Sequence, residues 1–283
     1  MPEPDVGPSA APQRTTPCVY LGHAALREFS TDSELGSRFA RALAARGGTL
    51  ALSMMNFLEY ARVTDREQVL CAERFVDGVL PRVFFMDVSP LDVMRRATDY
   101  LARGIAAAPD ADLQLFRDVA LQPGTQATSA RGWFTGAAAA RKTLAARQAE
   151  LADNLLEGIA HLPERPDAGM DVSRELREGA KRAHRVRATL ALLRALISTI
   201  QIERRAPLDR HDAIDLLHTV VPVSYCDYAL LDGRWCHLVE RANTQLLNES
   251  ITDLARVFSK RNKGLQRFLG MLEGAAETQS AKS

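Results

Sequence analysis

Five acidic residues of this 283-residue chain stand where a sheet protein could bring carboxylates together. One lies early in a helix that follows an apolar run, two share a later short helix, and two flank another apolar run. Divalent cations that promote phosphodiester hydrolysis need several carboxylates converging on one point. In a parallel sheet that point is the crevice at the carboxyl ends of the strands. The five residues are Glu59, Asp212, Asp215, Asp227 and Asp232.

Each of these residues also has an ordinary structural interpretation. Glu59 could be a solvated or capping carboxylate. Asp212 and Asp227 have the positions of first-turn helix and turn residues, which the helix dipole and turn geometry favour. His218 follows Asp215 by three positions, and residues at that spacing share a helix face. A packed, hydrogen-bonded histidine is the commoner outcome at such a place.

The first part of the chain has the pattern of a β-α-β unit. Short apolar runs at Cys18–Leu21 and Thr49–Ser53 predict buried strands. Residues 33–46 between them begin with an N-capping serine, carry apolar residues at helical spacing and end before Gly47. Such a unit implies a parallel sheet. A third strand is predicted at Arg82–Asp87.

The remainder predicts an α/β fold with a parallel sheet flanked by helices and split by a helical insertion. Helices are expected over residues 54–62, 64–80 and 89–100, strands over 220–225 and 228–231, and helical sequence over 243–274. Residues 104–206 predict two or three long helices without strands. The expected organisation is a loose tail at 1–16, an α/β domain at 17–103 and 207–245, a helical insertion at 104–206, and a C-terminal helix and tail at 246–283.

The order of these features resembles that of PIN-like nucleases. In that family an opening strand ends in Asp, a Glu lies early in a following helix, an Asp on a late helix is often written D-x-x-H, and a final strand ends in Asp. The corresponding segments here are Val19–His23, Asn56–Glu59, Asp215–His218 and Cys226–Asp232. The resemblance covers about residues 17–103 and 208–242. It leaves out the helical insertion and the C-terminal tail.

The resemblance implies a metal-dependent endoribonuclease with a PIN-like fold. Mg²⁺ or Mn²⁺ would be held by Glu59, Asp215 and Asp232, with help from Asp212 or Asp227. RNA is the implied substrate, and a toxin or defence role is implied with it. An antitoxin or regulatory protein, or a second copy of the chain, would be further partners.

One position departs from the family pattern. Gly22 stands where the family has its first catalytic Asp, and loss of one ligand should weaken metal binding and turnover. Three interpretations remain open: a natural pseudoenzyme, an inactivated variant of a toxic nuclease, or an enzyme that recruits another acid or a water. His23 beside it could touch metal-bound water or cap a loop. The competing function is a non-catalytic RNA-binding or protein-interaction module.

Two basic clusters flank the acidic segment in sequence and predict contacts with nucleic-acid phosphates. A solvated helix face, paired to Glu175 and Glu178, is the alternative for the first cluster. The first cluster is Lys181, Arg182, Arg185 and Arg187, and the second is Lys260, Arg261 and Lys263.

Composition sets wider bounds. Hydrophobic content of 46% and charged content of 25% are typical of a globular protein. The four cysteines lack the spacing of a zinc site and are too sparse for a disulfide scaffold, so we expect reduced thiols. No apolar stretch approaches the roughly 18 residues of a membrane span. We therefore expect a cytoplasmic protein without a membrane partner.

Overall fold

The computed structural model describes residues 15–103, 108–120, 129–161, 180–248 and 251–280. Five parallel strands form one sheet in the order β3-β2-β1-β4-β5. The predicted α/β class with a parallel sheet flanked by helices is confirmed, whereas the predicted tail at 1–16 lies almost wholly outside the described residues. The strands are β1 (Cys18–Leu21), β2 (Thr49–Ser53), β3 (Val83–Met86), β4 (Tyr228–Leu230) and β5 (Arg256–Phe258).

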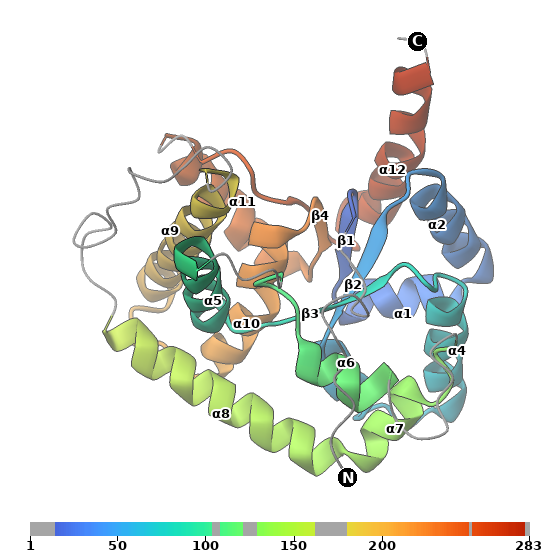
Figure 1. Cartoon of the computed structure of the whole chain (residues 1–283), viewed down its shortest axis with the longest axis horizontal. Coiled ribbons are helices and arrows are strands. Elements are labelled where there is room, and N and C mark those ends of the chain that lie inside the picture. The colour runs from blue at the N-terminus through green and yellow to red at the C-terminus, as the bar shows by residue number, and fades with distance from the viewer. Residues whose placement is uncertain (1–14, 104–107, 121–128, 162–179, 249–250, 281–283) are drawn as a thin grey trace.

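Helices cover both faces of the sheet (Figure 1). One face carries α1 (His23–Thr31), α2 (Ser33–Ala45), α4 (Arg66–Asp77) and α12 (Gly264–Ser280). The other carries α5 (Pro90–Arg103), α9 (Ala180–Arg204), α10 (Arg210–Tyr225) and α11 (Gly233–Asn248). The shorter elements are α3 (Met54–Tyr60), α6 (Leu113–Ala120), α7 (Trp133–Ala139) and the 3₁₀ turn η1 (Arg261–Lys263), and the long helix α8 (Arg141–Ala160) runs across the base of the view.

The strand order creates a crevice between β1 and β4. From β1 the chain winds outward to β2 and β3, and after α10 it returns to β4 and winds outward to β5 on the other side. The connections that follow β1 and β4 therefore leave on opposite faces. Parallel sheets of this kind bind ligands at such a switch point, outside the carboxyl ends of the strands.

The core is continuous from the sheet into the helices. Strands β1, β2 and β3 are fully buried, and β4 and β5 are partly buried. Helices α1, α2, α4 and α12 meet through Phe29, Phe39, Phe75 and Phe268, whose ring centroids are 5.1–6.3 Å apart. The same hydrophobic cluster extends into α7, α8 and α9. The described segments of the predicted insertion are thus helical, and they share the core of the α/β domain.

Helix α8 joins two helices at the carboxyl edge of the sheet. Arg210 in the first turn of α10 donates two hydrogen bonds, of 2.8 and 2.7 Å, to the carboxylate of Asp153. Arg62, just after α3, donates to Oε1 of Gln148 at 3.2 Å. The insertion therefore forms a wall beside the crevice.

One strand prediction and part of one helix prediction are wrong. Residues 220–225, expected as a strand, form the end of α10, where every side chain is buried and Pro222 lies inside the helix. A short apolar run has no periodicity that separates a buried strand from a buried helix. Conversely, β5 lies within the stretch expected to be helical. It forms because pairing with β4 provides hydrogen-bond partners for its backbone N–H and C=O groups.

The four cysteines are free thiols, and three of them are buried. Among the helices of the described ranges, none combines the length and apolar content needed to cross a membrane.

Candidate functional site

Glu59, Asp215 and Asp232 all lie at the carboxyl edge of the sheet. Glu59 lies on α3, which begins directly after β2, and Asp232 follows the end of β4. Helix α10 ends just before the amino end of β4, so its first turns, with Asp215, lie at the opposite, carboxyl edge. The negative charges of Asp215 and Asp232 both act on Glu59. Three distant segments thus contribute one acid each.

Glu59 lies between two histidines. Its Oε2 is 3.6 Å from Nδ1 of His23 on α1, and its Oε1 is 3.9 Å from Nε2 of His218 on α10. Neither distance is a direct hydrogen bond. The side chain is 28% exposed, yet Oε2 is buried and has no hydrogen-bond partner among the described residues. An unpaired buried acceptor is costly, and it marks the centre of the site.

The surroundings of Glu59 oppose its ionisation. Burial raises the pKa of Glu59 to about 8, and the charges of Asp215 and Asp232 act in the same direction, while Arg62 opposes the rise. Without a bound cation, the carboxyl group is therefore mostly protonated at neutral pH. A strongly shifted acid in a crevice, with charged partners that explain the shift, is a typical functional-site candidate.

Asp215 and Asp232 are held by the first turn of α11. Asp232 caps that helix, because its Oδ1 accepts the backbone N–H groups of Arg234 and Trp235, each at 2.9 Å. Burial raises the pKa of Asp215, and Asp232 adds to the rise. The Trp235 side chain donates a hydrogen bond to Asp215, which opposes the shift, as does His211. The indole therefore fixes Asp215 beside Asp232.

The two histidines of the site are neutral at pH 7. Burial lowers the pKa of His218 to about 4, and His23 and Arg62 add to the effect. Burial lowers the pKa of His23 too, together with Arg27. A neutral imidazole can donate at one nitrogen and accept at the other. His218 therefore belongs to the site, beyond the packing role that sequence reasoning favoured.

Asn56 positions α3, and the sequence reasoning did not single it out. Its Oδ1 accepts the backbone N–H of Ser53 at 2.9 Å, and its Nδ2 donates to the carbonyl of Leu21 at 2.9 Å. Both partners are strand ends, so one buried amide ties the Glu59 helix to β1 and β2. The Ser53-x-x-Asn56 spacing of a helix cap was the available signal.

Gly22 lies at the closest approach of the two central strands. Its N–H donates to the carbonyl of Leu230 at 2.8 Å. A Cβ atom added at Gly22 would lie 2.8 Å from the same oxygen. The backbone φ of −62° is ordinary. Glycine is therefore favoured by the lack of room for a side chain, and not by the backbone conformation. An Asp at this position would push β1 and β4 apart or need them to shift.

Two predicted members do not join the cluster. Asp227 precedes β4, so it lies at the amino edge of the sheet, where its Oδ2 accepts the N–H of Cys18 at 2.6 Å. Asp212 is fully buried and pairs with Arg204, and it accepts the N–H of Asp209 at 3.0 Å in a reciprocal helix cap. The structure thus gives both carboxylates capping or pairing partners, while Oδ1 of Asp212 is buried without a hydrogen-bond partner among the described residues.

The first basic cluster is only partly free to contact a ligand. The side chains of Lys181 and Arg182 lie outside the described residues. Arg185 donates to the carbonyl of Tyr225 at 3.0 Å and lies 5.6 Å from that ring. It therefore stabilises the end of α10, at the amino edge of the sheet, away from the acids. Arg187 is exposed.

Among the described residues, no group of three or more His, Cys, Asp and Glu side chains is close enough to hold a metal ion in the arrangement seen. The three acids influence one another electrostatically without converging on one point. Their chemistry nevertheless fits Mg²⁺ or Mn²⁺, because these cations prefer oxygen ligands. The unpartnered Oε2 of Glu59 is an atom that a cation would satisfy.

Comparison with known family models gave no match, and comparisons with curated proteins and with solved structures gave none either.

Proposed function

We propose that this chain is a metal-dependent endoribonuclease of PIN-like type that works without the family's first acid. The observation that carries the proposal is the buried, unpartnered carboxylate oxygen of Glu59 at the switch point of a parallel sheet, with Asp215 and Asp232 beside it. A toxin or defence role, with an antitoxin or regulatory partner, belongs to the proposal through the family resemblance alone.

In this proposal Glu59, Asp215 and Asp232 hold Mg²⁺ or Mn²⁺. A bound divalent cation would activate water and stabilise the negative charge of a phosphodiester under attack. The protein's own part is to keep three acidic side chains close together in a partly dry crevice, where a cation would favour the ionised form of all three. Since Glu59 is protonated at neutral pH without a cation, it would release a proton when it becomes a ligand.

In this proposal the site is adapted to the missing acid at Gly22. The close approach of β1 and β4 occupies the space of an added side chain. The next residue, His23, instead directs Nδ1 toward Glu59. A neutral imidazole there can orient Glu59 or a water molecule bound beside it.

The test is Mn²⁺ binding by calorimetry at pH 7.5, together with cleavage of a labelled single-stranded RNA. Asp215→Asn and Asp232→Asn should each weaken Mn²⁺ binding by at least tenfold and abolish cleavage. Asp227→Asn is the matched control, since it makes the same change at the opposite edge of the sheet, and it should leave both unchanged. Equal Mn²⁺ affinity in the parent and both site variants would refute the assignment.

The second candidate is a non-catalytic RNA-binding module with the same fold. Gly22 and the lack of a common coordination point among the described acids favour it. It requires salt-sensitive RNA binding that does not respond to Mn²⁺ and survives Asp215→Asn and Asp232→Asn. The same titrations distinguish the two candidates.

A further inference from the structure

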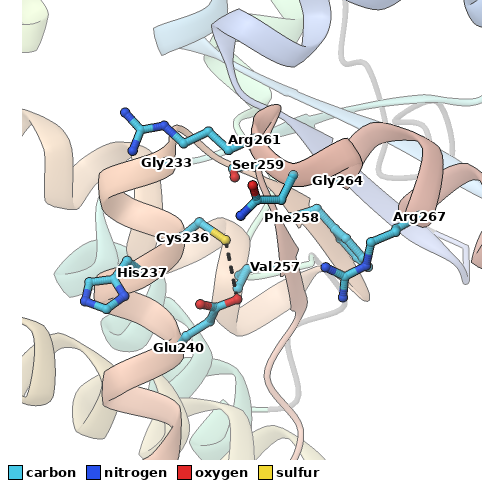
Figure 2. Close-up of a pocket in the computed structure, with 11 residues that line it drawn as sticks. Gly233, Cys236, His237, Glu240, Val257, Phe258, Ser259, Arg261, Gly264 and Arg267 are labelled. Atoms are coloured by element: carbon cyan, nitrogen blue, oxygen red, sulfur yellow. Dashed lines mark hydrogen bonds between the residues drawn. The ribbon is translucent and has the colours of Figure 1, made fainter.

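A cavity of about 320 Å³ lies at the start of α11 (Figure 2). It is bounded by the first turns of α11, the end of β5, η1 and the start of α12. The end of β5 belongs to the same carboxyl edge as the end of β4. Gly233, which lines the cavity, directly follows Asp232, and the charge of Asp232 is felt at Cys236 in the cavity wall. The cavity and the acids are therefore neighbours.

The cavity is rich in positive charge. Arg261 and Arg267 line it, and Lys263 stands between them in the chain. None of the three forms an ion pair with a residue in the parts of the chain that the structure describes. Glu240 is the one carboxylate among the described lining residues, and it lies 3.8 Å from the thiol of Cys236. Figure 2 shows the two arginines at different sides of the cavity, with Glu240 rising from α11 below them.

The backbone around the cavity is specialised for this arrangement. A Cβ atom at Gly233 would lie 2.8 Å from Nε of Arg261, which shows that this side chain packs against the first turn of α11. Asn262 and Lys263 have left-handed φ angles of 53° and 58°. Such angles are uncommon outside glycine and tend to persist at functional sites. The backbone next to Arg261 therefore has an uncommon conformation.

We infer that this cavity binds a backbone phosphate of a single-stranded RNA whose neighbouring phosphodiester lies at Glu59, Asp215 and Asp232. Guanidinium groups recognise phosphate oxygens through paired, charge-assisted hydrogen bonds. Two arginines without an ion-pair partner among the described residues line the cavity, whose volume of about 320 Å³ is close to the lower limit of known ligand pockets, roughly 300 Å³. The inference rests on the proposed function, for which it would supply the strand-positioning subsite.

The test separates binding from chemistry by working in EDTA. Binding of a fluorescein-labelled 12-nucleotide RNA is measured by anisotropy at several salt concentrations. Arg261→Gln and Arg267→Gln should each weaken binding about three- to tenfold and reduce the slope of log affinity against log salt by about 0.7, the value for one single-strand phosphate contact. Arg267→Lys keeps the charge and should retain that slope. Arg187 is an exposed arginine on α9, and Arg187→Gln is the matched control. It should change neither the RNA affinity nor the slope against salt.

If both glutamine variants bind the RNA as tightly as the parent protein does, the inference is overturned, even if Asp215→Asn abolishes cleavage. If the glutamine variants lose RNA binding but Asp215→Asn leaves the Mn²⁺ affinity unchanged, the phosphate subsite would be supported and the proposed nuclease function would be refuted. A nucleoside 5′-monophosphate that competes as strongly per molecule as the 12-nucleotide strand would show a mononucleotide site and overturn the strand assignment.

Discussion

Replacement of Glu59 by Gln should stabilise this protein above neutral pH. Each factor of ten between two acid dissociation constants is worth about 1.4 kcal/mol. The pKa of Glu59 rises from 4.5 to about 8 on folding. Between these values the folded chain holds a proton that the unfolded chain has lost, so stability falls as the pH rises. The loss amounts to about 3 kcal/mol at pH 7 and about 5 kcal/mol above pH 8.

Glutamine has nearly the same shape and does not titrate, so the variant should escape this loss. His218 acts in the other direction, because its pKa of about 4 in the folded chain makes stability fall as the pH drops below 6.5. His23, Arg62, Asp215 and Asp232 also face Glu59. These five groups are present in both proteins, so their contributions largely cancel in the comparison.

The assay is urea unfolding in EDTA from pH 5 to 9, followed by tryptophan fluorescence. The stability difference between Glu59→Gln and the parent should grow in favour of the variant by several kcal/mol across that range. Glu67→Gln is the matched control: Glu67 is exposed, and its partner Arg74 lowers its pKa. Parallel pH curves for Glu59→Gln and the parent would refute the reasoning. Added Mn²⁺ should raise the parent's melting temperature more at pH 8 than at pH 5.5, and should leave the Glu59→Gln variant unchanged.

Three other changes test the surroundings of the site. Gly22→Ala should cost about 1–3 kcal/mol of unfolding free energy, as overpacking does, because the added Cβ meets the carbonyl of Leu230; an unchanged urea midpoint would contradict this. Asn56→Ala leaves two buried backbone groups without their partner, each worth about 1–3 kcal/mol, and thermal melts should show the loss. Arg185→Ala should lower stability by about 2 kcal/mol through a lost charged hydrogen bond, whereas Arg187→Ala should stay within about 0.5 kcal/mol; equal effects on denaturant melts would sink the structural role of Arg185.

Much of the fold could be predicted from sequence because its signals are local. The strands at 18–21 and 49–53 and the helix from Ser33 are marked by apolar runs, capping residues and glycine stops. The end of α10 and the strand β5 could not be predicted in this way. A buried apolar helix and a buried strand look alike over six residues, and β5 has only three residues, whose pairing is with a strand far away in sequence.

The sequence by itself determined which acids were available and that they belong to a parallel α/β fold. The sequence also indicates that Asp227 lies away from the other acids, because a residue that precedes a parallel strand lies at the amino edge of the sheet. Only the tertiary structure decided that Asp215 faces Glu59 while Asp212, one turn earlier, is paired with Arg204. It also decided that Gly22 is packed against Leu230 and that Arg261 of the second basic cluster borders a cavity. The physical reason is that convergence depends on strand order and helix packing, which long-range contacts fix and no local pattern encodes.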